Sequence, residues 1–335
     1  MLFVDCNESD TIRSIFTQNQ KAMIRTGILG DEQVCKSIAS NIRDVGEIKL
    51  VGFFDPAGNR SVSSSGSPVS FFDSETLIRD VDAVIALSPM SSPEHIENLV
   101  RNSKHVLFEP THFFSRTEAS RLMNMIDEAD VKVQPSFDNR YNLVFRAVRP
   151  FVKNPRLIVS NHVTPFDAKK QISVLHDILL HDIDLVLSLV QSEIKSVTAT
   201  SVSIDRTSPD IINTRIEFNN KCVAQFHAGR IGTDASNEMS FYQNNHYIYA
   251  DLLNHQAFVA RKKSELSDVG LFSSQKGDIV CDPIPIWGGS RQFSSIKAFA
   301  DSIVKNTVPE VDVETMMRTF SVTQVIAEKL KLVSH

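Results

Sequence analysis

The stretch IRTGILGDEQVCKSI (residues 24–38) decides the first part of the fold. It opens with an apolar run of strand length, turns at Gly30, and continues with Val34, Ile38 and Ile42 at helical spacing. A strand, a tight turn and a helix in this order begin a βαβ unit. The helix N-terminus of such a unit can receive the phosphates of a nucleotide.

The same alternation continues along the chain as far as residue 136. The strand segments are continuous apolar runs, as expected for a parallel sheet buried on both faces. We therefore predict a Rossmann-like, doubly wound parallel α/β domain over residues 22–136. The further strands are expected at 48–55, 83–88, 105–109 and 131–135, and the further helices at 74–79, 93–102 and 116–129.

The pattern changes after residue 136. A helix at 141–152, a strand at 156–163 and an apolar helix at 174–190 precede strand after strand over 197–260, and two helices at 294–304 and 313–332 close the chain. Alternating polar and apolar residues in these strands predict an antiparallel sheet covered on one face. Residues 137–335 are thus expected to form an α+β domain with a large open, mainly antiparallel sheet. Residues 1–21 are expected to be an N-terminal extension, and 61–70 a flexible loop.

Length and composition are consistent with two globular domains. The chain has 335 residues, of which 42% are hydrophobic, and this argues against a disordered chain. Its net charge of -5 gives no reason to expect nucleic acid or a membrane surface as partner. Cys6, Cys35, Cys222 and Cys281 stand far apart, and no basic flank and apolar run mark a signal peptide, so we expect reduced thiols in the cytoplasm.

Glycine is scarce, with 12 residues in the whole chain. A dinucleotide-binding turn has the pattern G-x-G-x-x-G, and here only Gly30 matches, since Glu32 and Cys35 stand at the second and third positions. Glu32 adds bulk and charge where the backbone must approach the phosphates. Two like charges at about 4 Å repel by about 4 kcal/mol at an effective dielectric near 20. The substitution opposes phosphate binding.

Other residues at strand ends are candidates for the same crevice. Asp55 ends the second strand, where an acid can bond a ribose 2′-hydroxyl and disfavour a 2′-phosphate; it can equally be a strand-terminating Asp-Pro. Ser88 and Pro89 follow the next strand and would line the same crevice, unless they are turn residues only.

A polar stripe interrupts the apolar helix at 174–190. Asp177, His181 and Asp184 share one helix face by their spacing. An aspartate four residues from a histidine can orient the imidazole as a general acid/base facing a cleft, or the acids and the histidine can form a structural network between domains. Two His-Asp dipeptides in this helix also suggest a metal site. They point to different faces, and we expect no metal.

The ordered set GILG, LVGFFD, VDAVIALSP, KHVLFEP, FDNRYN and LHDILLHDIDL resembles the Gfo/Idh/MocA family of oxidoreductases over nearly the whole chain. The resemblance implies NAD(P), most simply NAD, on the first domain and a sugar- or cyclitol-like carbinol in the cleft beside the second. It also implies a homodimer or homotetramer formed through the second-domain sheet.

The resemblance further implies catalytic roles for Asp177 and His181 and a place at the cofactor for Glu109. Pro110 stands where the family has a catalytic lysine, so that role is vacant unless His112 or another group reaches in. Leu179 replaces a glycine and is expected to crowd the space for the ring or substrate.

Three functions follow from these residues. One is an NAD(P)-dependent oxidoreductase of a sugar-like carbinol, its activity impaired or lost. The second is a non-catalytic relative that serves as a ligand sensor or protein-binding partner. Metal-dependent hydrolysis is a distant third.

Overall fold

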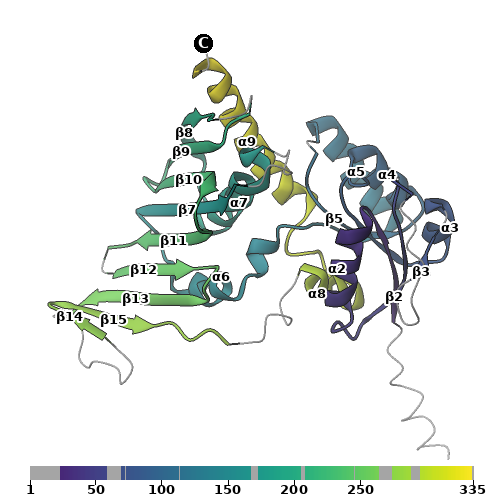
Figure 1. The fold of residues 1–335 in the computed structure, drawn as a ribbon, viewed down its shortest axis with the longest axis horizontal. Helices are drawn as coiled ribbons and strands as arrows, with labels where there is room; N and C mark the ends of the chain where they lie inside the picture. The colour runs from purple at the N-terminus through teal and green to yellow at the C-terminus, as the bar shows by residue number, and fades with distance from the viewer. Residues whose placement is uncertain are drawn as a thin grey trace, which may run out of the picture.

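The computed structural model describes residues 23–58, 69–71, 73–112, 114–166, 173–204, 208–244, 246–263, 274–287 and 295–333. These residues form two sheets that lie at opposite ends of the molecule, with helices between them (Figure 1). The extension predicted at 1–21 and most of the loop predicted at 61–70 lie outside the described residues. Val69 and Ser70, expected in that loop, instead form a short edge strand, which pairs with its neighbour through backbone hydrogen bonds.

The first sheet has six described strands, all parallel, in the order β3-β2-β1-β4-β5-β6. The order reverses between β1 and β4, and at such a switch point the carboxyl ends of the strands leave a crevice. The predicted doubly wound sheet is confirmed. Its strands are β1 (Ile24–Leu29), β2 (Ile48–Phe54), β3 (Val69–Ser70), β4 (Ala83–Ala86), β5 (His105–Phe108) and β6 (Val133–Pro135), and its helices are α2 (Glu32–Ile42), α3 (Ser74–Arg79), α4 (Pro93–Arg101) and α5 (Arg116–Ala129).

Two glycines allow β1 to pack closely against its neighbours. A Cβ at Gly27 would lie 3.0 Å from the Leu77 side chain on α3. Gly30 has φ +152°, and a Cβ there would lie 2.8 Å from Cβ of Leu87. Because a side chain would be crowded at both positions, these two glycines stand where the strand and its turn approach their neighbours closely.

The second sheet has nine described strands in the order β14-β15-β13-β12-β11-β7-β10-β9-β8. Every neighbouring pair is antiparallel except β7 and β10, which confirms the mainly antiparallel sheet. The two strands nearest its far edge, β14 and β15, were not predicted, since they are short and follow a polar segment. The strands are β7 (Leu157–Pro165), β8 (Ile194–Val202), β9 (Ile211–Phe218), β10 (Val223–Gly232), β11 (Ser236–Tyr242), β12 (His246–Asp251), β13 (Gln256–Lys262), β14 (Ser274–Lys276) and β15 (Ile279–Pro283).

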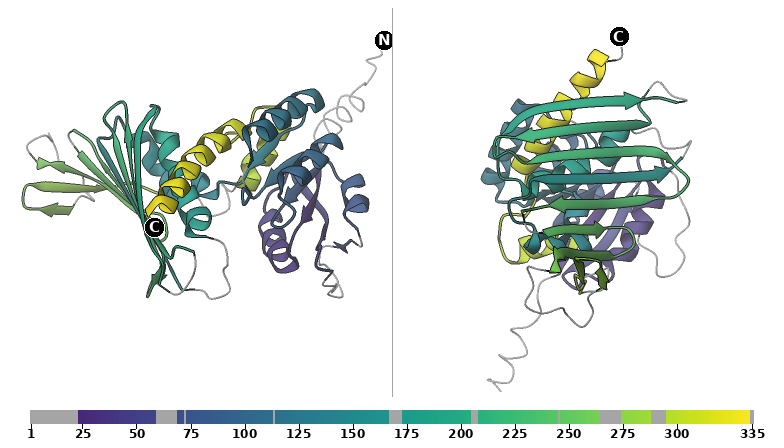
Figure 2. Two further views of the ribbon diagram at one scale, coloured as in Figure 1. Left: turned by 90° about the horizontal axis from the view of Figure 1, so that it is seen from above. Right: turned by 90° about the vertical axis from the view of Figure 1, so that its left-hand side faces the viewer.

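The second sheet is covered on one face only. On β9 the buried residues alternate with exposed ones, and Ile212, Ile216 and Phe218 contribute to the core beneath the helices. Figure 2 shows the other face of the sheet, over which no described helix lies. The remaining helices are α6 (Leu143–Val148) and α7 (Leu180–Leu189), which belong to this half, and α8 (Ser295–Val304) and α9 (Val313–Val333) at the end of the chain; the short turns are η1 (Asp138–Tyr141), η2 (Arg149–Phe151) and η3 (Leu175–Leu179).

Two predicted helices are interrupted in the structure. The helix expected at 174–190 consists of a π-helical turn, η3, followed by α7. The helix expected at 141–152 is the short α6 between two 3₁₀ turns, because Asn142 caps α6 and Pro150 follows it. π-helical turns are rare in proteins, and those that occur often lie at functional sites.

The C-terminal helices belong to both halves of the molecule. Phe299 and Ala300 of α8 pack in the core of the first sheet. The first part of α9 packs in a core of that sheet through Met316 and Phe320, and its last part packs with the second sheet through Ile326. This helix runs from one half to the other in Figure 1. The domain limits drawn at residues 22, 136 and 335 stay predictions. No helix among the described residues is long and apolar enough to cross a lipid bilayer.

Candidate functional site

A cleft of about 570 Å³ lies between the carboxyl ends of the first sheet and helix α7. One wall is apolar and comes from α2 and strands β4 and β5. The other carries hydroxyl, amide, carboxylate and imidazole groups. The cleft is lined by Val34, Ile38, Ile85, Leu87, Leu107, Phe108, Glu109, Ser136, Asp138, Asn139, Tyr141, Asn142, His181, Ser295 and Ile296.

His181 reaches this cleft from the first turn of α7. Its ring is partly exposed and lies edge-on against Phe137, with ring centroids 5.6 Å apart. The described part of the chain provides no hydrogen bond to its ring nitrogens, so both can meet a ligand. An imidazole that faces a cleft in this way can serve as a general acid or base.

The other two helix residues singled out from the sequence lie elsewhere. Asp177 belongs to the π-helical turn before α7 and does not line the cleft. Its role as the residue that orients His181 stays a prediction. Leu179 is 0% exposed and packs in the core of the second sheet. Leu179 is not among the residues that line the cleft, and its expected crowding of the space for the ring or substrate stays a prediction.

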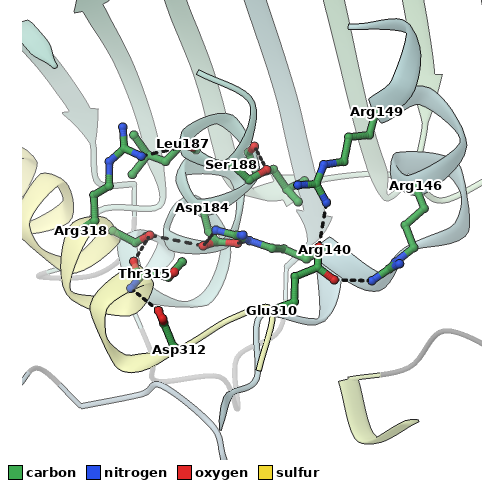
Figure 3. A network of polar contacts seen from close by, with 12 residues as sticks. Arg140, Arg146, Arg149, Asp184, Leu187, Ser188, Glu310, Asp312, Thr315 and Arg318 are labelled. Atoms are coloured by element: carbon green, nitrogen blue, oxygen red, sulfur yellow. Dashed lines mark hydrogen bonds and ion pairs between the residues drawn. The ribbon is translucent and has the colours of Figure 1, made fainter. Parts of the chain in front are cut away.

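Asp184, which the sequence places on the same face as His181, is part of the structural framework. It is 0% exposed and accepts two hydrogen bonds from Arg140, at 2.5 Å from Nε and 2.7 Å from Nη2. Thr319 of α9 donates a third, at 3.4 Å. Figure 3 shows Arg140 reaching across to Asp184 on α7. For Asp184 the structural interpretation of the polar stripe is therefore the one that its contacts support.

Asp182 also has a partner on another element. It is 1% exposed, accepts a hydrogen bond from Ser160 Oγ at 3.0 Å, and lies 3.1 Å from Nδ1 of His162. Both partners are on β7, so the acid holds α7 on the sheet and orients the His162 ring. No role for His162 was predicted; its signal in the sequence is the alternation of the polar residues Ser160, His162 and Thr164 along the strand.

Several lining residues come from the segment after β6. Ser136 donates to Asp138 at 2.7 Å, and Asn139 follows in η1. None was proposed from the sequence as a site residue, although FDNRYN carries part of the resemblance. The signal was present, because residues that follow a parallel strand at its carboxyl end lie at the crevice.

The turn between β1 and α2 has its amide groups engaged. Asp31 caps the helix, and its Oδ1 accepts from the amides of Gln33 at 2.8 Å and Val34 at 3.3 Å. Asp55 is 5% exposed; its Oδ2 accepts from the Glu32 amide at 3.3 Å and its Oδ1 from the Ala57 amide at 2.8 Å. These contacts are those of a strand-end turn, and a bond from Asp55 to a ribose stays a prediction.

Glu32 and Cys35 stand at the second and third glycine positions of the dinucleotide-binding pattern, and their side chains have different surroundings. Cys35 is 0% exposed and packs in the core below the turn, so the helix stays close to the strand. Burial raises the pKa of its thiol to about 12, which leaves it neutral and unreactive. The Glu32 carboxylate lies 2.6 Å from Nζ of Lys36, one helical turn later.

The remaining cofactor candidates are connected to each other. The Ser88 amide donates to Oε2 of Glu109 at 3.1 Å, so Glu109 holds the loop after β4. Of the predicted site residues, Glu109 and His181 line the cleft. Gly30, Asp55, Ser88, Pro89 and Asp177 do not.

Pro110 stands where the resemblance implies a catalytic lysine, and a vacant lysine role stays a prediction. Pro110 is buried, and His112 lies outside the cleft lining, with Nδ1 3.1 Å from the Thr111 hydroxyl. His112 therefore does not take the place of the lysine. Within the described residues, no group of three or more histidine, cysteine or acidic side chains is arranged to hold a metal ion.

The residues of the β1–α2 turn do not fit the pyrophosphate of a dinucleotide. Such a group needs free amides at the helix N-terminus and close approach to the backbone. Here the amides of residues 32, 33 and 34 already donate to two carboxylates, and Glu32 fills the position of the second glycine. The apolar wall of the cleft would suit a flat ring. The turn that would hold the phosphates, however, carries the carboxylates of Asp31, Glu32 and Asp55.

Comparisons with known proteins agree with this fold. Residues 146–248 match the model of the GFO/IDH/MocA C-terminal domain. The chain is 25% identical over 236 residues to UDP-N-acetylglucosamine 3-dehydrogenase of Acidithiobacillus ferrooxidans, covering 69% of this chain and 75% of that protein. It is 26% identical over 202 residues to inositol 2-dehydrogenase of Rhizobium meliloti, covering 56% of this chain and 61% of the relative.

Solved structures show the same architecture. The A. ferrooxidans dehydrogenase superposes with a TM-score of 0.80 at 20% identity, over 92% of this chain and 98% of that one. The scyllo-inositol dehydrogenase of Lactobacillus casei superposes with a TM-score of 0.70 at 18% identity, over 93% and 97%. Fold and cleft together define the class: a Rossmann-like domain joined to an open mixed sheet. Residues 146–248 thus match a domain of the Gfo/Idh/MocA kind, and the chain is similar to proteins named as dehydrogenases of a UDP-sugar and of inositol.

Proposed function

We propose that this chain binds a small sugar- or cyclitol-like molecule in its cleft, and that its nicotinamide-dependent oxidoreductase activity is impaired or lost. The proposal rests on a difference between two parts of the site: the residues that would contact a small ligand are in place, and those that would hold a cofactor are not. His181 and the polar segment after β6 face the cleft, whereas the turn that would hold a dinucleotide and the lysine position are both altered.

The polar wall of the cleft suits a molecule with several hydroxyl groups. Asp138 offers a carboxylate, Asn139 an amide, and His181 an imidazole, so the lining provides both donors and acceptors. Orientation of a small ligand by a few polar groups against an apolar wall is usual for such sites. The names of the relatives, which act on UDP-N-acetylglucosamine and inositol, support a ligand of this kind.

A calorimetric titration tests this proposal without cofactor. Inositols, hexoses and amino sugars are titrated into the wild-type protein, the His181→Ala variant and a control, His112→Ala, whose ring lies outside the cleft lining. We expect one class of ligand to bind the wild type and the control equally and to bind His181→Ala about tenfold or more weakly, the loss of about 1.4 kcal/mol. Equal binding by all three proteins, or no binding by any, would refute the proposal.

The second candidate function is the family's oxidoreductase activity. It is favoured by one observation: the His181 ring faces the cleft with both nitrogens free of bonds to described residues, as an acid/base must. This alternative requires the β1–α2 turn to admit a dinucleotide, which would be NAD, because an acid at position 55 disfavours a 2′-phosphate. Formation of NADH from the same panel, abolished by His181→Ala, would establish it.

The cytoplasm remains the proposed location, consistent with the free thiols of Cys35 and Cys222.

We also propose that the bare face of the second sheet joins copies of the chain into a homodimer or homotetramer. Four rings cluster on this face: Tyr242, Tyr247, Tyr249 and Phe258, with neighbouring centroids 5.0 to 5.9 Å apart. Tyr242 is 43% exposed. Light scattering should give a multiple of the 37.5 kDa chain mass and a monomer for Tyr242→Asp, and a monomeric wild type would exclude the assembly.

A further inference from the structure

We propose that the side chains of Asp31 and Glu32, together with the Asp55 carboxylate, occupy the phosphate-binding end of α2, so that the chain excludes dinucleotides by anions of its own. This inference goes beyond the proposed ligand binding in the cleft and does not depend on it. It names the residues that keep the cofactor out.

The first step is the set of donors that these acids use. A helix N-terminus leaves its first amides without partners inside the helix, and these amides bind the phosphates in a dinucleotide fold. In this chain the Glu32 amide donates to Asp55, and the Gln33 and Val34 amides donate to Asp31. Three successive donors are therefore already engaged.

The second step is charge. The positive end of the helix dipole favours one anion, and Asp31 and Asp55 already bring two carboxylates to it. Glu32 follows in the first turn of the helix, where it pairs with Lys36. A pyrophosphate would have to displace Asp31 from its amides and then lie beside Asp55, which is 5% exposed and held by a second amide, that of Ala57.

The third step is space. Gly30 allows the sharp turn. At the position of the second glycine of the pattern the chain has Glu32, which is 9% exposed. Its side chain begins at the position where the backbone must approach the phosphates. Both the donors and the room that a dinucleotide needs are thus taken by residues of the turn itself.

The experiment measures ADP-ribose, which carries the pyrophosphate and no nicotinamide, by isothermal titration calorimetry. The proteins are the wild type, Asp31→Gly/Glu32→Gly, and a control, Asp73→Gly. Asp73 caps α3 in the same domain through the Thr76 amide, so the control removes an equivalent cap from a helix that does not line the cleft. Glycine is itself tolerated as an N-cap, which favours folding of both variants.

We expect no binding to the wild type or to Asp73→Gly at about 1 mM ADP-ribose, and an affinity at least about tenfold higher in the double-glycine variant. Asp31→Asn/Glu32→Gln keeps the cap and removes the charge; it should fall between the wild type and the glycine variant. Circular dichroism checks that each variant is folded.

Two results would overturn the inference. One is micromolar binding of ADP-ribose to the wild type, since the turn would then accept a pyrophosphate as it stands. The other is the absence of any gain in both double variants, since Asp31 and Glu32 would then not be what excludes it. Neither result bears on the sugar titration of His181→Ala, so the two proposals fail separately.

Discussion

Acidic residues flank the cleft on both sides, and the two sets act in different ways. On α7, Asp182 and Asp184 bond side chains that are distant in the sequence: Ser160 and His162 on β7, and Arg140 in η1. In the β1–α2 turn, Asp31 bonds amides two and three residues away. The first set holds elements together, and the second completes one helix end. A carboxylate beside a cleft is therefore no sign of catalysis until its partners are known.

The two sets of acids differ in burial, and so we expect them to differ in how much they contribute to the free energy of unfolding. Asp184 is 0% exposed, and Arg140, its partner, is 7% exposed, so neither charge can be solvated if the other is removed. Asp31 is exposed, and water can replace it at the amides. We expect substitutions on α7 to affect the stability of the whole fold, and substitutions in the turn to affect it slightly.

The largest effect is expected for Asp184→Ala. The change leaves the Arg140 guanidinium buried without its counter-charge, which typically costs about 3–5 kcal/mol. The free energy of unfolding, measured by urea denaturation followed by circular dichroism, should fall by that amount. A loss below about 1 kcal/mol, the range of exposed ion pairs, would contradict the structural role of this pair.

The double variant Arg140→Met/Asp184→Leu is the matched control. Replacing both members of a buried ion pair by apolar residues of similar volume is often nearly neutral. The double variant should therefore be more stable than Asp184→Ala. If it is equally unstable, the loss arises from packing and not from the unpaired charge.

An intermediate effect is expected for Asp182→Ala. The substitution removes the acceptor for Ser160, which is 1% exposed, and leaves that hydroxyl buried without its partner. Leaving a buried polar group unsatisfied costs about 1–3 kcal/mol. Adding Ser160→Ala to Asp182→Ala should recover part of this loss. If the double variant were less stable than Asp182→Ala alone, this hydrogen bond would not be the cause.

The smallest effect is expected at Asp31. Replacing an aspartate N-cap by alanine costs about 1 kcal/mol, whereas glycine costs only a few tenths. Thermal unfolding of Asp31→Ala and Asp31→Gly should show that order. Asp31→Ala as destabilising as Asp184→Ala would remove the contrast between the two sides of the cleft.

Much of the fold could be predicted because it depends on local pattern. The strand at Ile24–Leu29 and the helix at Arg116–Ala129 have the predicted bounds. Apolar runs of strand length and a Ser-x-x-Glu capping box mark these elements in the sequence itself. The π-helical turn at Leu175–Leu179 was not predicted, because its apolar spacing within one turn is the same as that of an α-helix.

Residue types and their spacing were enough to predict the parallel sheet and the open sheet, and they show that two glycines of the G-x-G-x-x-G pattern and a lysine at position 110 are absent. Each of these depends on residue type and spacing, which the chain carries along its length. Three further features depend on packing between distant segments: His181 lines the cleft while Asp177 does not, Arg140 is the partner of Asp184, and Asp55 bonds the α2 turn. A helical period specifies which residues share a face, but the partner that meets that face comes from the packing of distant segments.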